Sequence, residues 1–146
     1  MIEITGLGKY FGDHKVLSDI SLSVGKGDVF GIVGHSGAGK STLLRCLNGL
    51  ESYSEGSVKV KGREVKDLND VELKQLRRDM GMIFQNFNLM NRKNVFENIM
   101  FPLKVWGTPK AEAEARVNEL LELVGLTAKR DEKVRNLSGG QKQRVG

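Results

Sequence analysis

Apolar and polar residues alternate over residues 2–4 and again over residues 20–24. This period of two predicts half-buried β-strands near the N-terminus. Residues 58–65 alternate around a central glycine and predict a short hairpin. Two compact apolar runs, at residues 29–33 and 80–84, are typical of strands that are covered on both faces.

A helical period follows the glycine-rich stretch before residue 40. It places Leu43, Leu44 and Leu47 on one face of a predicted helix, and Gly49 marks its expected end. The apolar face predicts that this helix packs on the strands.

Further helical segments follow, beginning with a short charged helix predicted over residues 70–78. Thr108 and Pro109 predict the start of another, with Thr108 as N-cap and Pro109 as first helical residue. Apolar residues then recur at helical spacing up to Gly125, the predicted stop. Strands dominate before residue 86 and helices after it, which predicts an α/β core followed by a helical part.

The amino-acid composition limits the class of protein to which the chain can belong. A chain of 146 residues suits one domain. The single cysteine, Cys46, excludes an internal disulfide framework and a cysteine zinc site. No apolar stretch approaches the ~20 residues that cross a bilayer, so we expect a soluble, cytoplasmic chain. The net charge of +5 comes from basic residues interspersed with acidic ones, so we expect no nucleic-acid partner.

Residues 34–41 read GHSGAGKS and match G-x-x-x-x-G-K-[ST] at every fixed position, between a predicted strand and a predicted helix. The glycines let successive N–H groups point at phosphate oxygens, and the helix start adds its positive dipole end. We expect Lys40 to reach the β- and γ-phosphates and Ser41 to bind Mg²⁺. The residues expected to bind the nucleotide are Gly34, Ser36, Gly37, Ala38, Gly39, Lys40, Ser41 and Thr42.

This loop alone is compatible with a kinase, a GTPase, a helicase or a transporter ATPase. A second motif, LSGGQ at residues 137–141, follows near the end of the chain. Ser138 is a natural N-cap there, and the two glycines after it leave backbone amides open to an anion. With both motifs in this order, the chain resembles the N-terminal part of the nucleotide-binding subunit of an ATP-binding cassette (ABC) transporter.

The resemblance runs from the first strand to the last residue and implies an α/β fold. It implies a P-loop NTPase (RecA-like) core with an antiparallel β element over residues 1–85 and an α-helical ABC subdomain over residues 86–137. The start of the signature helix then falls on residues 138–146. The chain is expected to end before the Walker B strand.

Further site residues are implied by the resemblance. Phe11 corresponds to the family's aromatic residue that stacks on adenine, with Tyr10 as the alternative. Gln85 matches the Q-loop glutamine, which approaches Mg²⁺ and the attacking water, so Lys40 and Gln85 are the expected catalytic residues and Ser41 and Gln85 the expected metal contacts. The signature residues expected to contact the γ-phosphate held by an opposite subunit are Ser138, Gly140 and Gln141.

The segments around these motifs resemble amino-acid importers, and most closely the methionine-uptake group. Residues 104–126 are equally similar to polar amino-acid importers. The resemblance implies ATP and Mg²⁺ as cofactors, a head-to-tail homodimer, and integral-membrane permease subunits that hold the chain at the inner face of the cell membrane.

No residue of the chain matches the family's Walker B carboxylates or its switch histidine, because residue 146 lies five residues past the LSGGQ motif. We therefore expect these residues by themselves to bind ATP without hydrolysing it. Two alternatives stay open: a truncated, non-hydrolysing nucleotide-binding module, and an ABC ATPase of a process other than transport, such as DNA repair or translation.

Overall fold

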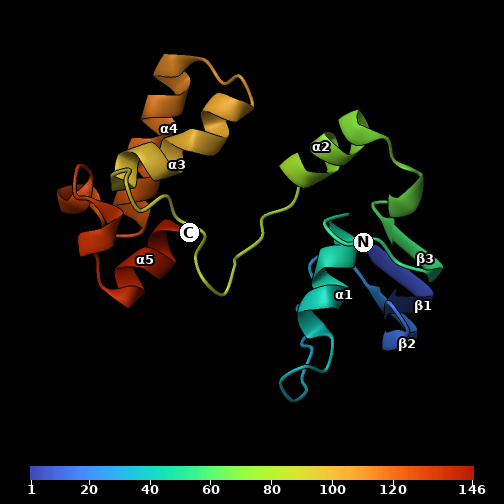
Figure 1. Ribbon diagram of the computed structural model, residues 1–146. Helices are drawn as coiled ribbons and strands as arrows, with labels where there is room; N and C mark the ends of the chain where they lie inside the picture. The colour runs from blue at the N-terminus through green and yellow to red at the C-terminus, as the bar shows by residue number, and fades with distance from the viewer. The chain divides into compact units, whose positions relative to one another are not determined.

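The computed structural model describes residues 1–146 as two compact units, Met1–Gly81 and Met82–Gly146 (Figure 1). Each unit has its own hydrophobic core. The boundary predicted from the sequence, between residues 85 and 86, lies a few residues further along the chain.

The first unit is built on an antiparallel four-stranded sheet in the order β2-β1-β3-β4 (Figure 1). Its strands are β1 (Ile2–Phe11), β2 (His14–Val24), β3 (Glu55–Val60) and β4 (Arg63–Glu64). The predicted antiparallel element and the predicted hairpin are both confirmed.

Helix α1 (Lys40–Leu47) packs against this sheet, and its Leu43 and Cys46 are buried in the core with Leu7 and Val58. The prediction that Leu44 shares the buried face is wrong, because its side chain is 46% exposed. In an eight-residue helix that packs on one surface only a narrow stripe is covered, and Leu44 lies about 100° round the helix from Leu43.

The two predicted buried strands do not form. Residues 29–33 carry no strand, and Val29 and Val33 are almost fully exposed. Residues 80–84 carry none either, with Ile83 79% exposed. A strand buried on both faces needs hydrogen-bonded neighbours, and neither segment pairs with any of the four strands. The apolar runs therefore have no regular secondary structure here. One lies between β2 and α1, and the other follows α2 (Asp70–Arg78).

Helix α2 has the bounds predicted from the sequence. A capping box at its start, formed by Asn69 and Glu72, satisfies the first backbone N–H groups. Near its end, the Arg77 guanidinium donates to the carbonyl oxygens of Asn48 (2.9 Å) and Gly49 (2.8 Å). Arg77 thus supplies hydrogen bonds to carbonyl groups at the C-terminal end of α1.

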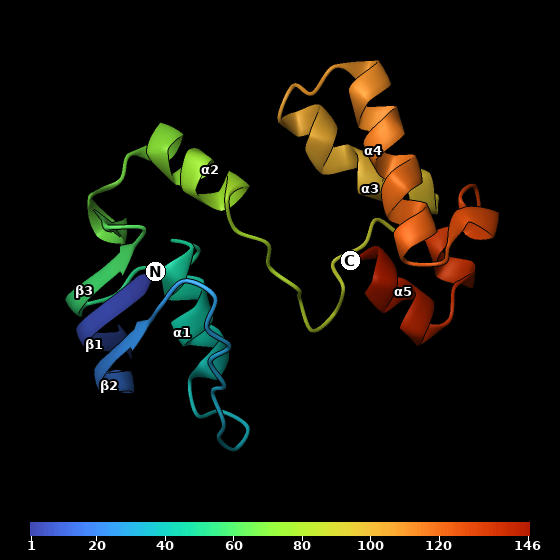
Figure 2. The ribbon, with the colours of Figure 1, turned by 180° about the vertical axis from the view of Figure 1, so that it is seen from behind.

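The second unit is helical, with α3 (Val95–Val105), α4 (Lys110–Leu123) and α5 (Gly139–Val145) around one core (Figure 2). Val117 and Leu121 of the predicted apolar stripe are buried there. Pro109 is the N-cap of α4 and not its first residue, because its carbonyl accepts from the Ala113 N–H while its ψ of 138° is extended. No helix of the structure has the length and apolar character required to cross a membrane.

Candidate functional site

The glycine-rich loop at residues 34–39 leads directly into α1, with Gly39 as the N-cap. Gly37 and Gly39 have φ angles of 82° and 83°, in the left-handed region that favours glycine. A Cβ at Gly39 would lie 2.8 Å from Leu17 Cδ2 and 3.1 Å from the Val16 carbonyl oxygen of β2, whereas a Cβ at Gly37 would meet nothing within 4 Å. The absence of a side chain at Gly39 therefore lets the start of α1 approach the sheet closely.

Lys40 closes this loop on itself. Its ammonium group donates to the carbonyl oxygens of Gly34 (2.7 Å) and His35 (2.8 Å), which leaves one of its three N–H bonds for a ligand. A Cβ at Gly34 would lie 3.2 Å from Ala38 Cβ, so a side chain there would make a tight contact with the curled loop. The Lys40 side chain therefore lies against the loop backbone.

The start of α1 is electrostatically suited to an anion. No side chain caps its N-terminus, and its first turn holds no acidic residue. The unpaired N–H groups and the positive end of the helix dipole are therefore available to a phosphate group. Ser41 and Thr42 are the second and third residues of this helix, directly after Lys40.

Phe11 and Tyr10 end β1 in different surroundings. Phe11 is 48% exposed, whereas the Tyr10 hydroxyl donates to Glu55 (3.2 Å) and Lys15 lies over the Tyr10 ring. The Lys15 ammonium also hydrogen-bonds Glu55 and holds the pKa of that carboxyl below its ordinary value. Of the two aromatic residues, Phe11 is the one whose side chain makes no hydrogen bond and keeps about half of its surface exposed.

The sheet register connects Phe11 with the glycine-rich loop. Lys9 of β1 pairs with Leu17 of β2, and Leu17 is the residue that Gly39 approaches. Phe11 lies two residues beyond Lys9 on the same strand. Phe11 and the loop residue Gly39 are thus both linked to the β1–β2 pair, within the first unit.

Gln85 lies in the second unit, at the start of a loop with strained backbone. Phe87 and Asn88 have φ angles of 59° and 49°, which are unusual for residues other than glycine. Gln85 is exposed and lines a pocket of this unit. The other residues that line it are Asn86, Phe87, Asn88, Leu89, Asn91, Val134 and Lys142.

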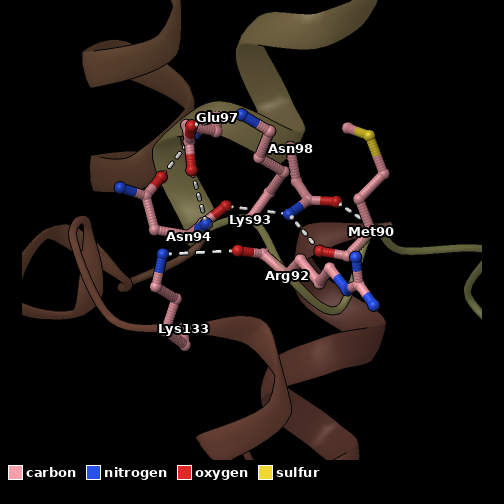
Figure 3. Close-up of polar contacts among 7 residues, drawn as sticks. All are labelled: Met90, Arg92, Lys93, Asn94, Glu97, Asn98 and Lys133. Atoms are coloured by element: carbon pink, nitrogen blue, oxygen red, sulfur yellow. Dashed lines mark hydrogen bonds and ion pairs between the residues drawn. The ribbon is translucent and has the colours of Figure 1, made fainter.

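The buried side chain of Asn98 anchors the end of this loop (Figure 3). Its Oδ1 accepts from the Met90 N–H (2.8 Å), and its Nδ2 donates to the carbonyl oxygens of Met90 (3.3 Å) and Asn94 (2.8 Å). Asn94 in turn forms a capping box with Glu97, which also pairs with Lys93 at 2.8 Å. The chain after Gln85 is therefore tied to the first turn of α3.

The LSGGQ segment starts α5. Ser138 is its N-cap, as predicted, and forms a capping box in which the Gln141 N–H donates to Ser138 Oγ and Gln141 Oε1 accepts from the Ser138 N–H. Gly140 is exposed, with nothing within 4 Å of the position that a Cβ would occupy. The Ser138 and Gln141 side chains thus bond each other's backbone, a pairing that the S-x-x-Q spacing could have indicated.

The sequence pattern did not single out Lys9, whose ammonium group lies 4.6 Å from the centroid of the Phe11 ring. The available signal was the i, i+2 spacing, which places both residues on one face of a strand. No group of three or more His, Cys, Asp or Glu side chains in the structure could hold a metal ion.

Comparisons with known proteins support these observations. A profile of the family described as "ABC transporter" matches residues 17–146. Proteins named methionine import ATP-binding protein MetN are similar over 99% of the chain, with 63% identity in Clostridium tetani and 53% in Campylobacter jejuni. The chain spans 46% and 48% of those relatives, less than half of their length.

The chain is similar in structure to two solved dimeric structures of an ATP-binding cassette. Each alignment covers 99% of this chain and 66% of the solved chain. One, in a post-hydrolysis state with ADP and Pi, has a TM-score of 0.87 at 33% identity, and the other 0.88 at 34%. The predicted fold class and the resemblance are confirmed. Because the profile covers most of its length, the chain belongs to the ABC transporter family.

Proposed function

We propose that this chain is the nucleotide-binding part of an ATP-driven amino-acid importer, with methionine as the first candidate substrate. The observation that carries the proposal is the uncapped, acid-free start of α1, with Lys40 folded against its glycine loop. The names of the relatives, methionine import ATP-binding proteins at up to 63% identity, support the choice of substrate.

In this proposal the loop and α1 hold the phosphates of ATP. Backbone N–H groups of the loop and the free donor of Lys40 bind the phosphate oxygens, and Ser41 offers its hydroxyl to Mg²⁺. Phe11 stacks on the adenine, and the assignment of Gln85 as a metal contact rests on the family resemblance alone. The loop geometry fits a phosphate group, since the glycines at 34 and 39 let the loop curl where side chains would make tight contacts.

The proposed partners are a second copy of the cassette and integral-membrane permease subunits. Ser138, Gly140 and Gln141 would face the γ-phosphate held by the opposite copy, through the open backbone of the glycines and the start of α5. The dimeric form of the solved cassettes supports this arrangement. The assembly would lie at the cytoplasmic face of the membrane.

ATP acts as a bridge in this mechanism. ATP binds the closed dimer more tightly than the open one and so favours the closed state. Hydrolysis removes this bridge, the dimer opens, and the coupled membrane subunits alternate between their two conformations. The acidic residues that support Mg²⁺ and polarise water in the family have no match in residues 1–146. We propose that these residues by themselves bind ATP with hydrolysis at background level.

Calorimetric titration of Mg-ATP tests the proposal. The Lys40→Ala variant should lose at least about tenfold in affinity, because it removes a charge-assisted contact to the phosphates. Lys26→Ala, at an exposed lysine for which the structure records no hydrogen bond or ion pair, is the matched control and should bind as the unchanged chain does. Equal affinity in the Lys40→Ala and Lys26→Ala variants would refute the nucleotide site.

Uptake of labelled methionine tests the substrate. Cells whose methionine uptake depends on the transporter that contains this chain should lose that uptake when the chain carries Lys40→Ala. Unchanged methionine uptake, alongside loss of another amino acid, would transfer the proposal to that amino acid.

A further inference from the structure

Lys9 carries a charge that is almost completely buried, since its side chain is only 8% exposed. Its ammonium group forms an ion pair with Glu51 (2.8 Å) and donates to the Ser52 hydroxyl (3.4 Å). The energy of such a pair does not by itself explain its presence, because replacing a buried ion pair by apolar side chains is often neutral or stabilising. An apolar residue on β1 could fill this space, so the charge itself calls for an explanation.

The charge lies against the Phe11 ring. The ammonium group is 4.6 Å from the ring centroid, within the range of a cation–π interaction. Lys9 and Phe11 are two residues apart on β1, and Phe11 keeps 48% of its surface exposed. One face of the ring is thus covered by a buried cation while much of its surface remains open to solvent.

Glu51, the ion-pair partner of Lys9, is itself fixed at the C-terminal end of α1. The backbone N–H groups of Leu50 (3.0 Å) and Glu51 (3.1 Å) donate to the Arg45 carbonyl in the last turn of that helix. Glu51 is thereby hydrogen-bonded to the C-terminal end of the helix that follows the phosphate loop. The chain of contacts from Phe11 through Lys9 and Glu51 to α1 lies entirely in the first unit.

We propose that Lys9 is a positioning residue for base recognition: held by Glu51, it fixes the Phe11 ring so that the open face receives the adenine base. This inference rests on the proposed nucleotide site. The cation withdraws electron density from the ring, which lowers the repulsion between the two negative faces of stacked aromatic rings. It also keeps the ring in one orientation before the nucleotide arrives, which lowers the entropic cost of stacking.

The test separates base from phosphate recognition. Affinities for Mg-ATP and for Mg-tripolyphosphate, which has the phosphates but no base, are measured on the full chain and its variants. Lys9→Met should weaken ATP binding by about threefold to tenfold, the range of a partly buried cation–π contact, and leave tripolyphosphate binding unchanged. Lys9→Arg keeps the cation and should restore most of the ATP affinity.

Two controls exclude a merely structural role. Lys59→Met removes an exposed lysine of the neighbouring strand β3 and should change neither affinity. In a Phe11→Leu background, Lys9→Met should have no further effect on ATP, because the ring through which Lys9 acts is gone. If Lys9→Met does not fold, the double variant Lys9→Met, Glu51→Gln replaces it, because it leaves no unpaired buried carboxylate.

The outcomes distinguish the inference from the function on which it rests. If the unchanged chain binds neither ATP nor tripolyphosphate, the proposed nucleotide site fails and the inference falls with it. If it binds both and Lys9→Met lowers the two affinities equally, the nucleotide site stands and the positioning role is refuted. An unaltered ATP affinity in Lys9→Met also refutes that role.

Discussion

A matched pair of glycine substitutions tests the close approach of the phosphate loop to the sheet. Gly37 and Gly39 have nearly the same positive φ, 82° and 83°, so an alanine at either position would lie in the left-handed region that favours glycine. Their surroundings differ, because only a Cβ at Gly39 would contact β2. The difference between Gly37→Ala and Gly39→Ala therefore isolates the packing contribution from the strain.

The magnitude follows from these two contributions. The left-handed conformation costs an alanine about 1–2 kcal/mol, which is the expected loss in Gly37→Ala. In Gly39→Ala the new Cβ would lie 2.8 Å from Leu17 Cδ2 and 3.1 Å from a backbone oxygen. Leu17 is 4% exposed, so it has little room to move, and overpacking adds about 1–3 kcal/mol. We expect Gly39→Ala to lose about 2–5 kcal/mol in the free energy of unfolding.

Urea unfolding with two optical probes provides the assay. Both tyrosines of the chain, Tyr10 and Tyr53, lie in the first unit, and its one tryptophan, Trp106, lies in the second. The tyrosine signal therefore reports the unit that holds the loop, while tryptophan fluorescence is an internal control. Equal losses in the two variants, or a larger loss in Gly37→Ala, would refute the contact between the loop and β2.

Two further predictions concern the first unit. Arg77→Leu should lower the free energy of unfolding of this unit by about 2–4 kcal/mol, because two hydrogen bonds from a charged donor to the end of α1 are lost. Lys74→Leu, at an exposed residue of the same helix, is the control. An equal loss of stability in Lys74→Leu would contradict the expectation. Burial tends to raise the pKa of Glu64, but hydrogen bonds from Ser57, Tyr53 and the Val58 N–H outweigh it and hold that pKa below the ordinary 4.5. A lowered carboxyl pKa stabilises the fold above pH 4.5, and this stabilisation is lost as the pH falls through the pKa of the folded state. Urea unfolding over a pH series should therefore show a fall in stability at acid pH that the Glu64→Gln variant lacks. The same pH profile in that variant would show that the Glu64 carboxylate is not responsible.

The sequence predicts some parts of the candidate site and not others. The loop at residues 34–41 is recognisable from its spacing because its glycines and lysine act through local backbone geometry. In the structure Lys40 donates to two carbonyl groups of the loop, and its contact with phosphate remains a prediction. The roles of Phe11 and Gln85 remain predictions. The ion pair of Lys9 with Glu51 joins residues far apart in the chain, so no local pattern reports it.

By itself the sequence determined the features that depend on neighbouring residues. The helix at Asp70–Arg78, the Ser138 N-cap and the alternation of β1 and β2 all follow from caps and periodicity, whose energies act within a few residues. The tertiary structure decided what depends on distant partners. The apolar run at residues 29–33 has the composition of a buried strand, yet it forms none here, because a strand exists only with neighbours that accept and donate its hydrogen bonds.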